Sequence, residues 1–143
     1  MIYSTATKDV VSLQPAARVN GLAASCASVD RKGFDFANVK LLLGATDVGL
    51  TACKLQESDD NSTFTDIPGA DFSVSGVLPA AGDSNKTFEW DVTLNARKRY
   101  LRPAITVGSG TLGAYACVLV QLHRAEQAPY NPATRGAAQV LTV

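Results

Sequence analysis

The sequence carries little charge, and that charge is balanced. Charged residues make up 18% of the 143 residues, and thirteen basic side chains match thirteen acidic ones. A net charge of zero provides no general attraction to nucleic acid or to anionic lipid. We therefore expect neither nucleic acid nor a membrane among the partners of this protein.

Cysteine and histidine are equally scarce. Cys26, Cys53 and Cys117 are odd in number and widely spaced, which is typical of reduced thiols buried as small apolar side chains. His123 is the only histidine, so a catalytic triad, a cysteine–histidine pair or a histidine–metal site would require it. It follows an apolar run, where the rim of a sheet is the expected position. We predict no enzyme activity, no cofactor and no metal site.

No apolar segment is long enough for a membrane helix without interruption. Residues 103–122 lack charge and have about the length that a bilayer requires, but Gly108, Gly110 and Gly113 lie at their centre. The same glycines match the GxGxxG pattern of dinucleotide-binding folds, which requires a helix next. A strand-like run follows here, so we predict a glycine-rich hairpin loop. The first residues lack the basic and apolar regions of an export signal, so we expect folding in the cytoplasm.

Alternation of apolar and polar residues is the main pattern that is present. It is clearest over residues 87–94, where Phe88, Trp90 and Val92 face one way. No long stretch shows helical periodicity. Further strands are predicted over residues 21–29, 39–46, 50–57, 61–67, 72–77, 100–107 and 115–122. Such a series of short strands predicts an all-β fold, a two-sheet antiparallel β-sandwich of jelly-roll type.

The turns and apolar runs add detail to this prediction. Residues 47–49 should join the strands on either side of them into a hairpin, and Pro68 with Gly69 should close the strand before them. Pro103 lacks an amide donor, which favours an edge strand or a bulge over residues 100–107. Residues 115–122 are apolar on both faces, as expected of a central strand covered on both sides.

The two ends of the chain differ from its middle. We expect an N-terminal arm over residues 1–19, the sandwich over residues 20–124 and an extended C-terminal arm over residues 125–143. The last arm combines a proline-bearing stretch with an apolar terminus, which should bind a partner. The candidate contact residues are Pro129, Tyr130, Pro132, Val140, Leu141 and Val143 in the arm, together with the basic cluster of Arg97, Lys98 and Arg99.

One acidic turn resembles a calcium loop only in part. Asp59, Asp60 and Asn61 offer oxygen ligands at close spacing, but the glycine and the distant glutamate of such loops are missing. A solvated turn is the better interpretation.

Two stretches carry a family resemblance, KLQESDDNSTFTDIPGA at residues 54–70 and KRYLRPAITVG at residues 98–108. Together they resemble small virion proteins of tailed bacteriophages, in particular capsid cement or decoration proteins. The resemblance implies a jelly-roll-like sandwich that forms dimers or trimers on the outside of the phage head. Its partner there would be the major capsid protein, whose neighbouring subunits it would bridge.

Two alternatives remain open at this point. A head–tail connector, neck or tail protein would share the sandwich, and its low copy number per particle would distinguish it. A carbohydrate-binding sandwich would need exposed aromatic side chains on one flat face, but Trp90 alternates inward with Phe88 and Val92.

Overall fold

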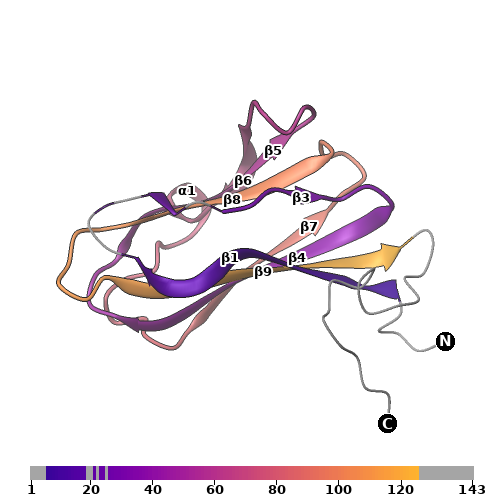
Figure 1. Ribbon diagram of the computed structural model, residues 1–143. Coiled ribbons are helices and arrows are strands. Elements are labelled where there is room, and N and C mark those ends of the chain that lie inside the picture. Colours follow the sequence, from indigo (N-terminus) through magenta and orange to yellow (C-terminus); the bar gives the residue numbers. More distant parts are fainter. Residues whose placement is uncertain (1–5, 19–20, 22, 25, 126–143) are drawn as a thin grey trace, which may run out of the picture.

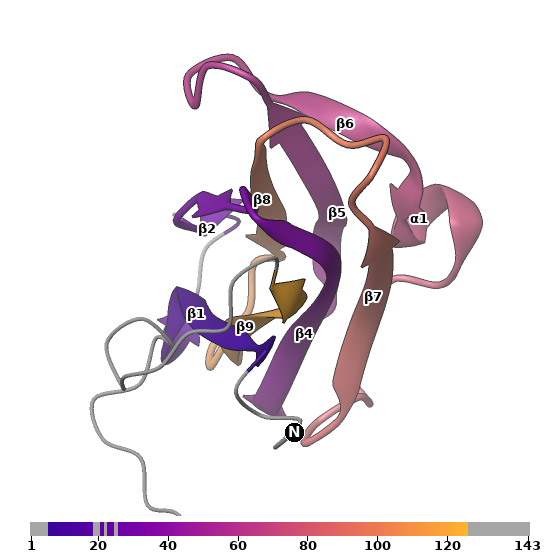
Figure 2. The same ribbon diagram turned by 90° about the vertical axis from the view of Figure 1, so that its right-hand side faces the viewer.

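Two antiparallel sheets packed face to face form the protein, which confirms the predicted all-β sandwich (Figure 1). The computed structural model describes residues 6–18, 21, 23–24 and 26–125. In Figure 2 the two sheets are seen from one end, with β7 and β6 on the same side of the molecule.

In each sheet, strands that are neighbours in space are seldom neighbours along the chain. Sheet A contains, in spatial order, β1 (Lys8–Arg18), β9 (Ala114–Ala125), β4 (Phe34–Thr46) and β7 (Thr87–Thr93). Sheet B contains β2 (Ala23–Ala24), β8 (Tyr100–Val107), β5 (Leu50–Ser58) and β6 (Thr65–Asp71), and the short β3 (Val29–Asp30) also pairs with β8. One helical turn, α1 (Phe72–Ser75), follows β6. Most connections pass from one sheet to the other, as in a jelly roll.

The inner faces of both sheets form one apolar core. Strict alternation places every second side chain of β8 and β9 inside it, as period-two strands require. The largest fully buried side chains are Leu41, Leu55, Leu94, Leu101, Ile105, Leu122, Val39, Val107, Val118, Val120, Pro79 and Pro103. The strand predicted at residues 87–94 is confirmed as β7, with Trp90 buried and its neighbours in sequence exposed.

The predicted N-terminal arm is wrong for residues 8–18, which form β1 at one edge of sheet A. Its register against β9 shifts between Val11 and Leu13 and again between Leu13 and Ala16. These irregularities break the alternation that would have indicated a strand. The burial of Ser12 and Leu13 shows that this segment belongs to the sandwich.

The predicted hairpin around residues 47–49 is also wrong, because β4 and β5 lie in different sheets. The Asp47 carboxylate accepts hydrogen bonds from the N–H groups of Leu112 and Gly113, at 2.7 and 2.8 Å. These bonds tie the β4–β5 connection to the β8–β9 connection, so both cross between sheets at the same end of the molecule.

The glycine-rich segment at residues 108–113 is therefore no hairpin loop either. It connects β8 in sheet B to β9 in sheet A. A Cβ atom on Gly110 would lie 2.7 Å from Asp47 Oδ1, and one on Gly108 would lie 2.9 Å from the Gly49 oxygen. Close packing of the two connections therefore requires these glycines, and this accounts for the GxGxxG pattern without a nucleotide.

The strands predicted at residues 61–67 and 72–77 are displaced or absent. Pro68 and Gly69 lie inside β6, where its register against β5 is irregular, and an edge strand tolerates such a proline. Residues 72–75 form α1, because the Asp71 carboxylate caps the turn by accepting the Ser73 N–H at 2.8 Å.

Pro103 does not make β8 an edge strand. β8 lies between β5 on one side and the short strands β2 and β3 on the other. β2 ends at Ala24 and β3 begins at Val29, so the partner strand is interrupted beside Pro103. The predicted strand at residues 21–29 is thus two short pieces, and the interruption accommodates the missing amide.

Candidate docking face

The outer face of sheet A changes from apolar to polar along its length. Its central strand β9 contributes alternate side chains that point away from the core, and β4 supplies their cross-strand partners. From one end to the other, these outward pairs are Cys117–Leu42, Leu119–Lys40, Gln121–Asn38 and His123–Phe36.

The apolar half of this face forms what we call the apolar patch, made of Val11, Leu42, Tyr115, Cys117 and Leu119. Val11, Leu42 and Tyr115 remain 46%, 39% and 45% exposed, and the other two are half-buried. Val11 lies opposite Leu119 and Leu42 opposite Cys117, so the five side chains are contiguous. Contiguous apolar side chains on a surface are typical of an interaction site, whereas isolated ones are ordinary.

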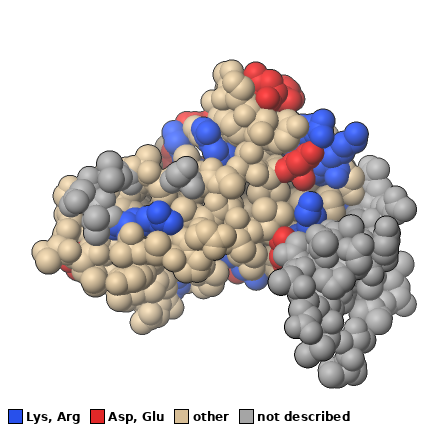
Figure 3. Space-filling model, viewed as in Figure 1, with Lys and Arg blue, Asp and Glu red and all other residues tan. Residues whose placement is uncertain are grey.

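A shallow hollow of about 270 Å³ adjoins the apolar patch. The eight residues that line it are all uncharged and come from the edge strand β1 and the central strands β4 and β9 of sheet A: Pro15, Ala16, Leu42, Leu43, Gly44, Tyr115, Ala116 and Cys117. Figure 3 shows that few charged side chains lie over β1 and the start of β9, at the left of that view, whereas they gather toward the other end.

Most polar side chains of the other half pair with one another, although the buried Asn38 Oδ1 has no hydrogen-bond partner among the described residues. Asn38 Nδ2 donates to Asp91 Oδ1 at 2.6 Å, and Lys40 Nζ lies 3.6 Å from Glu89 Oε1. His123 is half-buried opposite Phe36 near the end of β9, close to the predicted rim position. It lines a hollow together with Asn38, Asp91 and Thr93.

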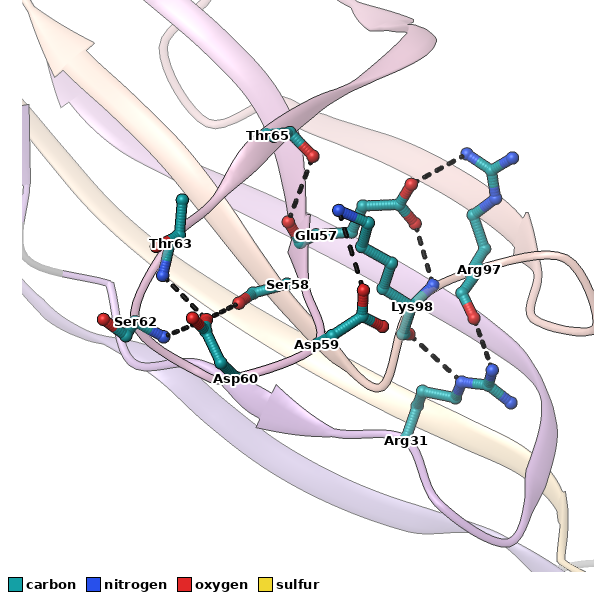
Figure 4. Close-up of polar contacts among 10 residues, drawn as sticks. All are labelled: Arg31, Glu57, Ser58, Asp59, Asp60, Ser62, Thr63, Thr65, Arg97 and Lys98. Atoms are coloured by element: carbon teal, nitrogen blue, oxygen red, sulfur yellow. Dashed lines mark hydrogen bonds and ion pairs between the residues drawn. The ribbon is translucent and has the colours of Figure 1, made fainter.

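The predicted basic cluster is paired within the chain. Arg97 Nη1 lies 3.6 Å from Glu57 Oε1, and Lys98 Nζ lies 3.8 Å from Asp59 Oδ2 (Figure 4). Arg99 Nη2 lies 2.7 Å from Asp30 Oδ2, and this hydrogen-bonded guanidinium lowers the pKa of the Asp30 carboxyl.

The main chain of the same cluster is fixed as well. Glu57 Oε2 accepts the Lys98 N–H at 3.0 Å, and the Arg31 guanidinium donates to the main-chain oxygens of Arg97 and Lys98. Figure 4 shows these side chains converging on one turn. A contact between the cluster and a partner therefore stays a prediction, and such a contact would have to compete with these internal pairs.

The acidic turn is organised by one carboxylate. Asp60 Oδ1 accepts the N–H groups of Thr63 and Ser62 at 2.8 and 2.9 Å, and the Ser58 hydroxyl at 2.7 Å. These donors, among which the Thr63 amide contributes most, lower the pKa of Asp60 to about 2. The carboxylate thus stabilises the turn itself (Figure 4). Within the described part of the chain, no three histidine, cysteine or acidic residues are grouped to hold a metal.

The three thiols are free, as predicted, and two of them are buried in the core. Burial raises the pKa of Cys53 to about 12 and that of Cys26 to about 11. Cys117 differs, because it lies half-buried on the outer face within the apolar patch. Burial raises its pKa as well.

The C-terminal contact residues, from Pro129 to Val143, lie outside the described residues, so their contacts stay predictions. Among the residues that are described, no helix is long and apolar enough to cross a bilayer.

Sequence reasoning missed the apolar patch, although a signal was present. Residues 115–122 are apolar on both faces, and we interpreted this as coverage on both sides. β9 is indeed central, but sheet B covers only its inner side, and Tyr115 on the other side is half exposed. An apolar outer side on a central strand is the pattern of a surface that another molecule covers.

The strand order defines the chain as a two-sheet jelly-roll sandwich. No protein-family model matches it, and no curated protein sequence matches it. A solved structure described as "Crystal structure of PBSX exported protein XepA" is similar in fold, with a TM-score of 0.58 and 20% sequence identity. The likeness covers 100% of this chain but only 44% of that protein, so this chain spans less than half of its length.

Proposed function

We propose that this chain is a structural protein of a tailed-phage particle, a capsid cement or decoration protein that docks on the outside of the head. It acts without catalysis, by stabilising contacts between neighbouring subunits of the major capsid protein. The apolar patch on the outer face of sheet A is the observation that carries the proposal. Covering it removes apolar surface from water, which drives association.

Two further observations support a phage origin. The segments at residues 54–70 and 98–108 resemble those of phage decoration proteins, and the fold is similar to that of XepA from the phage PBSX. A sandwich with rigid faces suits repeated docking on a symmetric shell. Many copies of a modest interface then stabilise the shell together, because each added copy strengthens the same lattice of contacts.

Charged substitutions in the apolar patch test the proposal. Leu42→Glu with Tyr115→Glu places two carboxylates on the outer face of sheet A, and we expect the doubly substituted protein to fold but to lose particle binding. Ala104→Glu with Thr106→Glu is the matched control, because these residues point outward from sheet B. Phage heads that lack the protein are mixed with each purified variant, and bound copies are counted by gel densitometry. Equal binding by both variants would contradict docking through sheet A.

Stoichiometry separates the proposal from its rivals. Hundreds of copies per particle indicate decoration of the head, whereas a handful indicate a connector, neck or tail component. A chain found in the culture medium but never on particles would overturn both and favour an exported role.

Removal of the C-terminal arm tests its predicted contribution. Deletion of residues 128–143 should leave a folded sandwich that binds heads weakly or not at all, since Val140, Leu141 and Val143 are expected to contact the shell. A truncated protein that still decorates heads would restrict docking to the sandwich.

A further inference from the structure

The free edge of β7 offers unpaired main-chain groups. β7 is the last strand of sheet A, and within the described part of the chain it pairs only with β4. At its two ends the Leu94 N–H donates to the Asp35 oxygen at 2.8 Å, and the Lys86 oxygen accepts the Leu43 N–H at 3.0 Å. Because antiparallel bonding alternates, even-numbered residues of β7 bond to β4. The N–H and C=O groups that face the open side, to the right of β7 in Figure 2, belong to Thr87, Glu89, Asp91 and Thr93.

A groove with an aromatic wall lies beside this edge. It has a volume of about 440 Å³ and runs between β7, β6 and α1, so that the last strands of both sheets border it. The Phe72 ring packs 5.0 Å from the Trp90 ring, and Trp90 Nε1 donates to the Ala70 oxygen at 3.1 Å. Val74 in α1 and Val77 just after it are 82% and 81% exposed. The groove thus combines an apolar wall with charged side chains, of which Asp71, Glu89 and Asp91 are acidic and Arg97, already paired with Glu57, is basic.

The outward side chains of β7 select among possible occupants. Glu89 and Asp91 are both exposed and stand on either side of Trp90 in the sequence. If a second copy paired its own β7 antiparallel about Trp90, each Glu89 would face an Asp91, and like charges opposite each other are destabilising. On the β4 side, by contrast, Lys40 stands opposite Glu89. Charge complementarity on the free side favours basic side chains.

We propose that the free edge of β7 binds an extended segment of another protein by strand addition. The segment carries basic side chains at alternate positions, opposite Glu89 and Asp91, and an apolar side chain between them that enters the groove beside Trp90. Main-chain hydrogen bonds supply affinity in this mode of recognition, and the alternate side chains supply specificity. This proposal does not rest on the function proposed above.

A pair of synthetic peptides tests charge selection. The basic peptide acetyl-TKVKVKT-amide is compared with the acidic acetyl-TEVEVET-amide, and Trp90 fluorescence reports binding because it is the only tryptophan in the chain. We expect saturable binding of the basic peptide and at least about ten-fold weaker binding of the acidic one. If neither binds at millimolar concentration, the two carboxylates serve only to keep the edge from self-association, and the proposal fails.

Side-chain variants locate the binding. Neutralisation by Glu89→Gln with Asp91→Asn should weaken the basic peptide about five- to thirty-fold, since it removes two cross-strand charge pairs. Asp59→Asn removes an exposed charge from the distant β5–β6 turn and should leave the affinity within about two-fold. Equal loss in both variants would indicate general charge attraction and would overturn the proposal.

Main-chain variants establish strand addition. Asp91→Pro removes an N–H that faces the open edge and spares the bonds to β4, so it should abolish peptide binding. A basic peptide N-methylated at alternate residues is the equivalent change in the ligand and is used if the proline variant does not fold. Undiminished binding of the methylated peptide would exclude strand addition. A dimer in sedimentation that Asp91→Pro dissociates would assign the edge to a second copy instead.

Discussion

The outer faces of the two sheets differ in how their side chains meet water. On sheet B the polar groups satisfy one another: Lys54 Nζ lies 2.6 Å from Asp66 Oδ2, and Arg102 Nη2 donates to Gln56 Oε1 at 2.8 Å. The Arg102 guanidinium also lies 3.8 Å from the centre of the Phe64 ring. On sheet A the apolar patch leaves Tyr115 half exposed. On sheet B the polar side chains are therefore already paired in the free protein. On sheet A, a partner that covers the apolar patch removes apolar surface from water, which is favourable.

The two sides of β4 provide the strongest test of this comparison. Leu41 is fully buried in the core, and Leu42 points outward and is 39% exposed. Leu41→Ala should lower the free energy of unfolding by about 2 to 5 kcal/mol, because it leaves a cavity. Leu42→Ala should lower it by less than about 1 kcal/mol and should weaken docking instead. Urea unfolding measures both, and equal losses would contradict the assignment of the two faces.

Substitution of Glu57, which links the end of β5 to the basic cluster, should have the next largest effect on the free energy of unfolding. Glu57 is 9% exposed and accepts the Lys98 N–H while it pairs with Arg97. Glu57→Ala should cost about 1 to 3 kcal/mol, because it leaves a part-buried donor unsatisfied. Asp59→Ala, which breaks a long and exposed pair, should cost less than about 0.5 kcal/mol. If the two variants unfold at the same urea concentration, the internal network contributes nothing to sheet B.

Local pattern accounts for what could be predicted. The alternation at residues 87–94 and the apolar run at residues 115–122 indicated β7 and β9, because side-chain direction in a strand depends only on neighbouring residues. The two irregularities of β1 removed that signal at residues 8–18. The sandwich could therefore be predicted, but not its N-terminal strand.

Long-range pairing accounts for what could not be predicted. Whether the chain turns back into the same sheet after residue 46 depends on the bonds between Asp47 and the backbone at Leu112 and Gly113, far along the sequence. The candidate site depends on the same information. In the sequence, an apolar side of a strand that another sheet covers looks the same as one that faces solvent. The sequence therefore predicts that Tyr115 is covered, whereas it is 45% exposed.

Acid should act on the β5–β6 turn of sheet B, whereas the apolar patch contains no carboxyl group. The pKa of Asp60 is about 2 in the folded protein, below its ordinary value of 3.8, because the Thr63 amide, the Ser58 hydroxyl and the Ser62 amide donate to its carboxylate. A lowered folded pKa gives stability that is present above the unfolded pKa and is lost as pH falls through the folded one. The contribution should therefore disappear between about pH 4 and pH 2.

A single substitution checks this assignment. Asp60→Asn removes the titrating group, so the urea midpoint of the variant should fall less between pH 4 and pH 2 than that of the unsubstituted protein. Carboxyl chemical shifts measured by NMR over the same range should show Asp60 titrating near pH 2. A normal titration near pH 4 would show that the turn is not held by its amides.

The smallest perturbation is chemical modification of the Cys117 thiol, which reports on the apolar patch and should leave the stability of the fold unchanged. Cys117 is half-buried in the apolar patch, and Cys26 and Cys53 are buried in the core with pKa values raised to about 11 and about 12. Iodoacetamide at pH 8 should therefore modify Cys117 first, because only the thiolate reacts and the core thiols are both protonated and inaccessible. If docking covers the apolar patch, the modification of Cys117 should slow at least ten-fold on phage heads, as followed by mass spectrometry. An unchanged rate on decorated heads would show that the exposed half of sheet A faces away from the shell.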